Sequence, residues 1–183
     1  MTGQSPAAPP VVPASVRAAY GLISVADVPH GVGLINLTLR ARGPGGDVVL
    51  QRQHPAFAAP VNDDIHAVTE RLAARGVATP RLVPTGDGAR SFTDEEGRVW
   101  RALTFLSGGT SQVRVSSPAH AAEAGAATAR FHGALAGFEH AYAHVRPGIH
   151  DLSYRRARLD AAIAAHPAHR LAGQVAAAMQ RLE

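Results

Sequence analysis

The chain has 183 residues, 46% of them hydrophobic, with 18 basic and 14 acidic residues that give a formal net charge of +4, so a packed core is feasible. Every basic residue is arginine and no cysteine occurs, which excludes a phosphate-binding lysine, disulfides and cysteine-ligated zinc. No apolar run approaches the ~18 residues of a membrane span, and no basic stripe with interleaved aromatics is present, so we expect neither a membrane nor a nucleic-acid partner.

The N-terminal segment predicts a disordered leader. Four prolines in residues 1–13 disfavour helix and strand. The segment lacks the positive start and the apolar stretch of a secretory signal. We therefore expect a cytoplasmic protein whose first element is a short helix over residues 14–20.

Three strands are predicted next, over residues 22–28, 34–42 and 48–53. In the second strand, apolar and polar residues alternate, which is typical of a strand with one buried face. The glycine-rich segment 43–47 separates the second strand from the third and predicts a turn. The three strands favour an antiparallel meander.

A long helix is predicted over residues 60–75, because its apolar residues share one face at helical spacing. Gly76 is a candidate helix end. Three further strands follow over residues 81–84, 91–93 and 99–106, the last two as a hairpin.

The remaining residues predict helices over 119–136, 151–165 and 168–182. Ser116-Ser117-Pro118 is a start signal for the first, with a serine as the cap, and Asp151 is an N-cap or first-turn acid of the second. A buried stripe is expected on the first helix, formed by Ala124, Ala127, Phe131 and Leu135.

The order β-β-β-α-β-β-β followed by helices predicts an α+β fold. We expect a strand-rich lobe over residues 14–107, then a hinge and part of a helical lobe over residues 108–183.

The segment from Gly31 to Asn36 is the first candidate for chemistry. Two glycines, Gly31 and Gly33, let a backbone approach a phosphate group closely, and their N–H groups can bind it. The pattern matches neither a P-loop nor a dinucleotide-binding fingerprint. An ordinary β-turn is the alternative interpretation.

Two later strands carry the other candidates. Gln51 lies on the strand over residues 48–53, and the helix after it offers three acids, Asp63, Asp64 and Glu70. In two-lobe kinases such a strand carries the cation that contacts the phosphates, paired with a helix acid. The strand over residues 99–106 ends in a glycine-rich loop, as a nucleotide-binding hinge does. A half-exposed strand and a plain core strand are the alternatives.

Taken together, these motifs resemble the superfamily of aminoglycoside phosphotransferases and choline kinases, and within it the N-acetylhexosamine 1-kinase-like group. The matching motifs are Gly31-Val32-Gly33-Leu34-Ile35-Asn36, Val49-Leu50-Gln51, Val68-Thr69, Ala129-Arg130-Phe131-His132 and His150-Asp151.

The resemblance implies a protein-kinase-like N-lobe that uses ATP and magnesium to phosphorylate a hydroxyl of a sugar or amino alcohol. It implies that Gln51 stands where many relatives have lysine, with Asp64 on the facing helix. The remaining nucleotide-binding residues that it implies are Gly31, Gly33, Asn36, Thr104, Phe105 and Leu106.

The catalytic motif of the superfamily, His-x-Asp followed by asparagine, is absent. Asn62 is the last asparagine, and His150-Asp151 lacks the intervening residue, so a helix-capping aspartate is the preferred interpretation. We therefore expect no magnesium site and an N-terminal fragment that is inactive alone. The alternatives are a non-catalytic module that binds nucleotide or a partner, and a partner surface on the alanine-rich helices.

Two other chemistries are not supported. His140 and His144 lie four residues apart, but the glutamate of a zinc-protease motif is missing. No Gly-x-Ser-x-Gly nucleophile motif occurs either.

Overall fold

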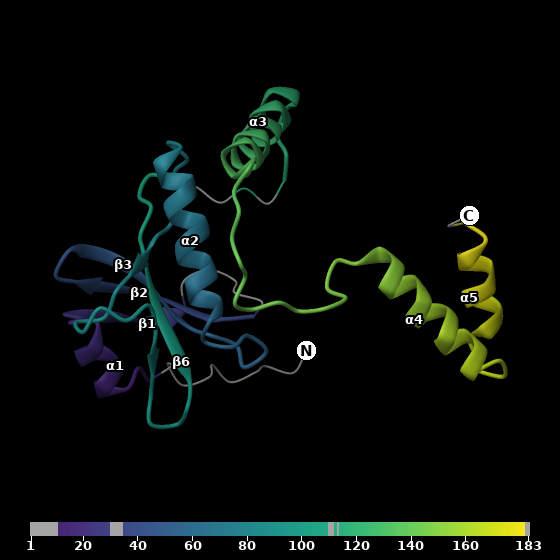
Figure 1. Cartoon of the computed structure of the whole chain (residues 1–183), viewed down its shortest axis with the longest axis horizontal. Coiled ribbons are helices and arrows are strands. Elements are labelled where there is room, and N and C mark those ends of the chain that lie inside the picture. The colour runs from purple at the N-terminus through teal and green to yellow at the C-terminus, as the bar shows by residue number, and fades with distance from the viewer. Residues whose placement is uncertain (1–10, 30–34, 110–111, 113, 182–183) are drawn as a thin grey trace, which may run out of the picture. The chain divides into compact units, whose positions relative to one another are not determined.

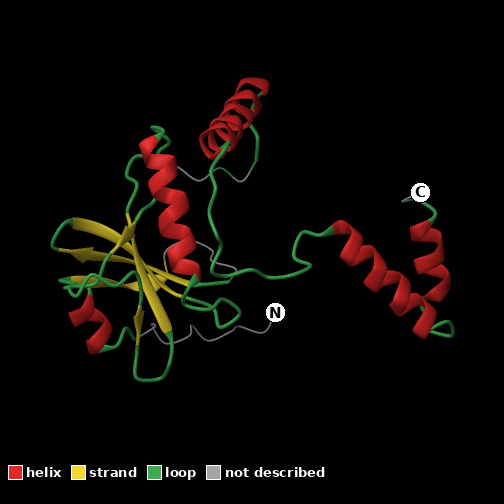
Figure 2. Cartoon of the chain, viewed as in Figure 1, coloured by secondary structure: helices red, strands yellow, loops and turns green. Residues whose placement is uncertain are grey.

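The computed structural model describes residues 11–29, 35–109, 112 and 114–181. The chain forms two compact units, Met1–His144 and Val145–Glu183 (Figure 1). Within the described residues, every strand belongs to the first unit (Figure 2).

The elements follow the predicted order β-β-β-α-β-β-β and then helices, which confirms the α+β expectation. The strands are β1 (Ser24–Pro29), β2 (Leu37–Gly43), β3 (Gly46–Arg52), β4 (Leu82–Val83), β5 (Phe92–Thr93) and β6 (Val99–Thr104). The helices are α1 (Ala14–Ala19), α2 (Val61–Ala74), α3 (Pro118–Leu135), α4 (Leu152–Ala165) and α5 (Ala172–Met179).

All strand pairs in the sheet are antiparallel, in the order β1-β2-β3-β6-β4, with β5 paired to β6. A tight turn joins β2 to β3, where Gly43 pairs with Gly46. Gly46 has φ +114°, a conformation that favours glycine. The pairing of β3 with β6 is not local, because α2, β4 and β5 lie between them in sequence.

The hydrophobic core lies on the α1 face of the sheet. The alternation predicted for the second strand is confirmed, since Leu39 and Ala41 are buried while Arg40 is exposed. The core consists of Val12, Val16, Tyr20, Leu39, Ala41, Val48, Leu50, Trp100 and Ala102. The Tyr20 hydroxyl donates a hydrogen bond to the Trp100 carbonyl oxygen over 2.9 Å, which fastens the end of α1 to β6.

Helix α2 covers the opposite face. Successive strand residues point to opposite faces, so the neighbours of Leu50 and Ala102, namely Gln51 and Arg101, point away from the core. Arg101 contacts Asn62 of α2, which places α2 on this second face. The helix ends before Gly76, whose φ of +73° stops the helical path.

Helix α3 begins as predicted but packs differently. The Ser117 hydroxyl accepts a hydrogen bond from the backbone N–H of His120, so the serine is the N-cap. The expected buried stripe is wrong: Phe131 is 40% exposed, and Ala134 is the buried residue of this helix. Contact with α2 occurs at this end, where Arg71 Nε donates to the Ala134 carbonyl oxygen over 3.1 Å.

The second unit consists of α4 and α5. Asp151 caps α4 by accepting a hydrogen bond from the backbone N–H of Tyr154 over 2.9 Å, as the capping interpretation predicted. Neither helix has a buried residue. Among the helices of the described residues, none has the length and apolarity required to cross a lipid bilayer.

Candidate functional site

Three strands and α2 bring four polar side chains together on the α2 face of the sheet. Thr38 of β2 pairs in register with Gln51 of β3, and Gln51 pairs with Arg101 of β6. Asn62, in the first turn of α2, is the fourth member. We call these four residues the polar cluster.

Hydrogen bonds fix the polar cluster. Gln51 Nε2 donates to Thr38 Oγ1 over 3.2 Å, and Gln51 Oε1 accepts from Arg101 Nε over 2.9 Å. Arg101 Nη1 donates to Asn62 Oδ1 over 3.3 Å, and Asn62 Nδ2 donates to Gln53 Oε1 over 3.1 Å. Because the network joins three strands to a helix, no member can rotate without breaking a bond.

Arg101 is the charged member of the cluster. Burial lowers the pKa of Arg101, but an arginine guanidinium remains charged at neutral pH. Its acceptors are neutral amide oxygens, and no carboxylate of the described residues forms a salt bridge with it. This face of the sheet therefore holds a positive charge that no acid among residues 11–29, 35–109, 112 and 114–181 pairs with.

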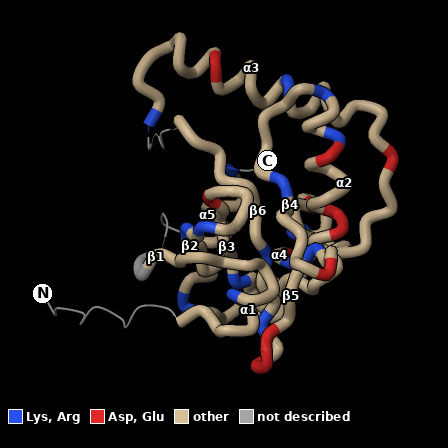
Figure 3. The backbone as a smooth tube through the Cα atoms, turned by 90° about the vertical axis from the view of Figure 1, so that its left-hand side faces the viewer, with Lys and Arg blue, Asp and Glu red and all other residues tan. Residues whose placement is uncertain are grey.

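Other arginines of the chain do have counter-ions, and basic and acidic residues are interspersed along the backbone (Figure 3). The arginine pairs are Arg40 and Arg42 with Asp47, Arg81 with Glu70, Arg90 with Asp63, Arg98 with Asp94 and Glu96, and Arg156 with Asp160.

Asp64 lies on α2 but is bonded away from Gln51. Its carboxylate binds His140 Nε2 over 2.8 Å and accepts from the backbone N–H groups of Ala143 over 2.8 Å and His144 over 2.9 Å. Burial would raise the pKa of Asp64, but the hydrogen bonds from these three residues outweigh it, so the pKa is lowered. Asp64 thus anchors the segment after α3.

The predicted glycine-rich segment is only partly described. Gly31 and Gly33 lie outside the described residues. Asn36 is described, and its Oδ1 accepts a hydrogen bond from the backbone N–H of His54 over 2.9 Å. This hydrogen bond joins the residue before β2 to the segment that follows β3.

The predicted hinge residues lie at the end of β6. Thr104 is held by Arg81, whose carbonyl oxygen accepts from the Thr104 N–H over 2.8 Å and whose N–H donates to Thr104 Oγ1 over 3.0 Å. The guanidinium of Arg40 lies 4.4 Å from the centre of the Phe105 ring. Leu106 is 49% exposed. The segment is anchored at Thr104 and open to solvent at Leu106.

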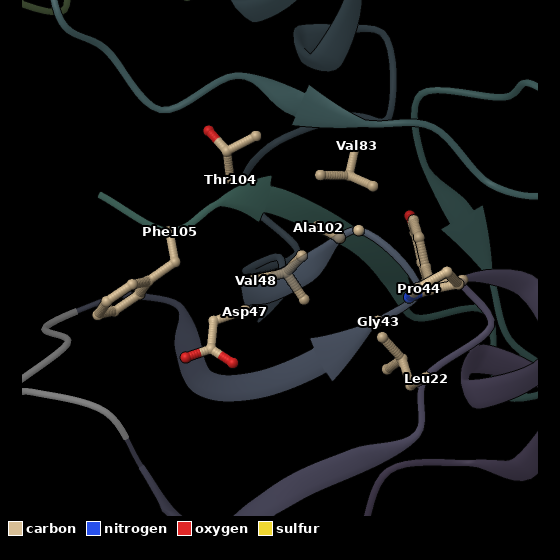
Figure 4. A pocket seen from close by; sticks show the side chains of 11 residues that line it. Leu22, Gly43, Pro44, Asp47, Val48, Val83, Ala102, Thr104 and Phe105 are labelled. Atoms are coloured by element: carbon tan, nitrogen blue, oxygen red, sulfur yellow. The ribbon is translucent and has the colours of Figure 1, made fainter. Parts of the chain in front are cut away.

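A cavity of about 310 Å³ lies close to the hinge (Figure 4). Its lining includes Leu22, Pro44, the core-side residues Val48 and Ala102, and the hinge residues Thr104 and Phe105. Since Val48 and Ala102 belong to the α1-side core, the cavity opens on the face opposite the polar cluster. The cavity and the polar cluster are therefore separate features.

Local pattern missed three members of the polar cluster: Thr38, Asn62 and Arg101. Thr38 and Arg101 alternate with apolar residues along their strands, and Asn62 lies in the first turn of an amphipathic helix. These positions indicate a polar face but not a binding site. Their meeting depends on the pairing of β3 with β6, which local pattern does not give.

His140 and His144, the two histidines four residues apart, contact Asp64, the first through its ring and the second through its backbone N–H. In the part of the chain that the structure describes, no three His, Cys, Asp or Glu residues lie together as a metal site.

Comparison with known proteins places these features in context. Residues 28–183 match the family model described as "Phosphotransferase enzyme family". A solved structure of "Amicoumacin kinase hAmiN in complex with AMP-PNP, Ca2+ and Ami" is similar, with a TM-score of 0.56 and 12% sequence identity. The similarity covers 66% of this chain and 39% of that one, so the two share a kinase-like fold, and the present chain spans about two fifths of the other.

Proposed function

The chain belongs to the phosphotransferase enzyme family, and from that premise we propose that its strand-rich unit binds an adenine nucleotide on the α2 face of the sheet. In this proposal the phosphates lie at the polar cluster around Gln51. The adenine edge lies at the hinge backbone of Thr104, Phe105 and Leu106. The donor to adenine is the Leu106 N–H, because the N–H groups of Thr104 and Phe105 already donate to the carbonyl oxygens of Arg81 and Asp47.

The observation that carries this proposal is the hydrogen-bonded polar cluster, which includes the positive charge of Arg101. Phosphate oxygens bind to hydrogen-bond donors and to cations, and Arg101 and Gln51 together offer both. Adenine can be bound by backbone N–H and C=O groups, and the segment after β6 provides backbone at the solvent boundary. These features support the proposal of a nucleotide on this face.

Magnesium is a different matter. The Asp64 carboxylate already binds three groups, and the described residues hold no cluster suited to a metal ion. The 183 residues also lack the His-x-Asp motif, so we propose that they bind nucleotide without turnover. In the whole protein the γ-phosphate would pass to a hydroxyl of a sugar or amino alcohol.

Calorimetric titration of the 183-residue chain with AMP-PNP tests the binding proposal. We expect saturable binding with one nucleotide per chain. Gln51→Ala should weaken this binding, because it removes both amide contacts of the cluster. Gln180→Ala, on the second unit, is the matched control and should bind as the wild type does.

Two results would contradict the proposal. If millimolar AMP-PNP gives no binding heat, the nucleotide-binding proposal is wrong and a partner-binding module is the better explanation. Sustained multiple turnover of ATP with a sugar or amino alcohol would instead contradict the absence of catalysis.

A further inference from the structure

The guanidinium of Arg101 is positioned as a ligand-binding group. An arginine has five N–H donors, and two of its nitrogens, Nε and Nη1, are bound to Gln51 and Asn62. These two bonds come from different elements, β3 and α2. They hold the plane of the guanidinium in one orientation.

The third nitrogen, Nη2, is available. It has no hydrogen-bond partner within the described residues, and it is not among their buried unpaired atoms. It therefore reaches solvent while the rest of the group is held. Nε and Nη1 donate to amide oxygens, which carry no charge. The positive charge of the Arg101 guanidinium is therefore not neutralised by these two partners.

Arg40, another arginine on the α2 face, is paired with a carboxylate. Arg40 is exposed, its guanidinium binds Asp47, and it covers the Phe105 ring. A cation that is paired with a carboxylate attracts an anion less, because the anion must displace the existing partner. Arg101 is the better candidate for an anionic ligand.

We propose that Arg101 is the residue that contacts the nucleotide phosphates in this chain, with Gln51 and Asn62 orienting its guanidinium. The inference rests on the proposed function. It assigns to β6 the positive charge that a lysine on β3 would otherwise supply, in a chain with no lysine. Arginine suits the task because its planar group binds phosphate oxygens in pairs.

Titrations with ATP and with adenosine test the assignment, since the two ligands differ only in the phosphates. For Arg101→Gln we expect a loss of about tenfold or more in ATP affinity, as for removal of a charge-assisted contact. Adenosine affinity should stay within about twofold of the wild type. Arg101→Lys keeps the charge but loses the paired geometry, so its ATP affinity should fall between the two.

Arg17→Gln is the matched control. It removes one exposed arginine from α1, on the opposite face of the sheet, and should leave both affinities unchanged. Thermal melting of each variant by circular dichroism shows whether it is folded. Since adenosine binding reports an intact site, a folded Arg101→Gln protein that binds adenosine but not ATP supports the assignment.

The two proposals fail in different ways. If the wild type binds ATP and folded Arg101→Gln binds it equally well, the role of Arg101 is wrong and nucleotide binding stands. Equal losses of ATP and adenosine affinity would also overturn it, because they indicate a structural role. If the wild type binds neither ligand, both proposals are wrong.

Discussion

Substitution of Asp94 by asparagine should destabilise the strand-rich unit. The Asp94 side chain is fully buried at the β5–β6 turn, next to the strand that carries Arg101. Its Oδ1 accepts from the backbone N–H groups of Glu96 and Arg98, and its Oδ2 accepts from Arg98 Nε and from Trp100 Nε1 over 2.8 Å. An asparagine oxygen can replace Oδ1, but its NH₂ group would then face two donors.

The loss can be estimated from these contacts. The indole N–H of Trp100 is buried and would have no acceptor, which costs about 1–3 kcal/mol. The hydrogen bond from Arg98 is charge-assisted, but the Arg98 side chain is partly exposed to solvent. Loss of this bond therefore adds no more than about 1 kcal/mol to the destabilisation. We expect Asp94→Asn to lower the free energy of unfolding at pH 7 by about 2–3 kcal/mol.

The pH dependence provides a second test. Burial would raise the pKa of Asp94, but hydrogen bonds from Trp100, Arg98 and Glu96 outweigh it and lower the pKa from 3.8 to about 2. A lowered pKa means that stability is present above pH 3.8 and is lost as the pH falls through about 2. After allowance for screening at the surface, the wild type should lose about 1–2 kcal/mol more than the variant over this range.

Urea unfolding measures both effects. Trp100 is the one tryptophan of the sequence, and it bonds directly to Asp94, so its fluorescence reports this region. Asp63→Asn removes an exposed partner of Arg90 and should change stability by about 0.5 kcal/mol or less. If Asp94→Asn matches the wild type in stability and in its response to acid, the buried carboxylate does not hold this turn.

Three further predictions concern the anchored segment, the core and the hinge. Asp64→Asn should speed hydrogen exchange at the backbone N–H groups of Ala143 and His144, because it weakens their acceptor; unchanged exchange would mean that Asp64 does not hold the segment. Leu50→Ala, at a position with 0% exposure, should lower the free energy of unfolding by about 2–5 kcal/mol, and a urea titration that finds less than about 1 kcal/mol would place this side chain outside the core. Leu106→Pro removes one N–H from the proposed adenine edge and should weaken AMP-PNP binding about three- to tenfold in calorimetry, whereas Leu106→Ala keeps that N–H and should bind normally; equal affinities would exclude this N–H as a contact.

The sequence could predict the parts of the fold that depend on local chemistry. Alternation along β2 indicates which side chains enter the core, because strand residues alternate between faces. Ser117 and Asp151 could be identified as helix caps, since their short polar side chains accept from nearby N–H groups.

The remaining features depend on contacts between distant residues. Phe131 fits the apolar stripe of a buried helix, yet within the described residues α3 meets α2 mainly near Ala134, so the ring stays exposed. Arg101 and Gln51 are 50 positions apart in sequence. Only the order of the strands brings them together. Gln51 could be named as a candidate from the sequence, whereas Arg101 could not.

A crystal structure of the 183-residue chain with AMP-PNP would show whether the phosphates contact Arg101. We expect a nucleotide on the α2 face of the sheet, with a phosphate oxygen within hydrogen-bond distance of Arg101 and the adenine at the backbone of residues 104–106. Thr104 and Phe105 also line the cavity beside Pro44, so the phosphates decide: a nucleotide whose phosphates lie on the α1 face, away from Arg101, would refute this assignment.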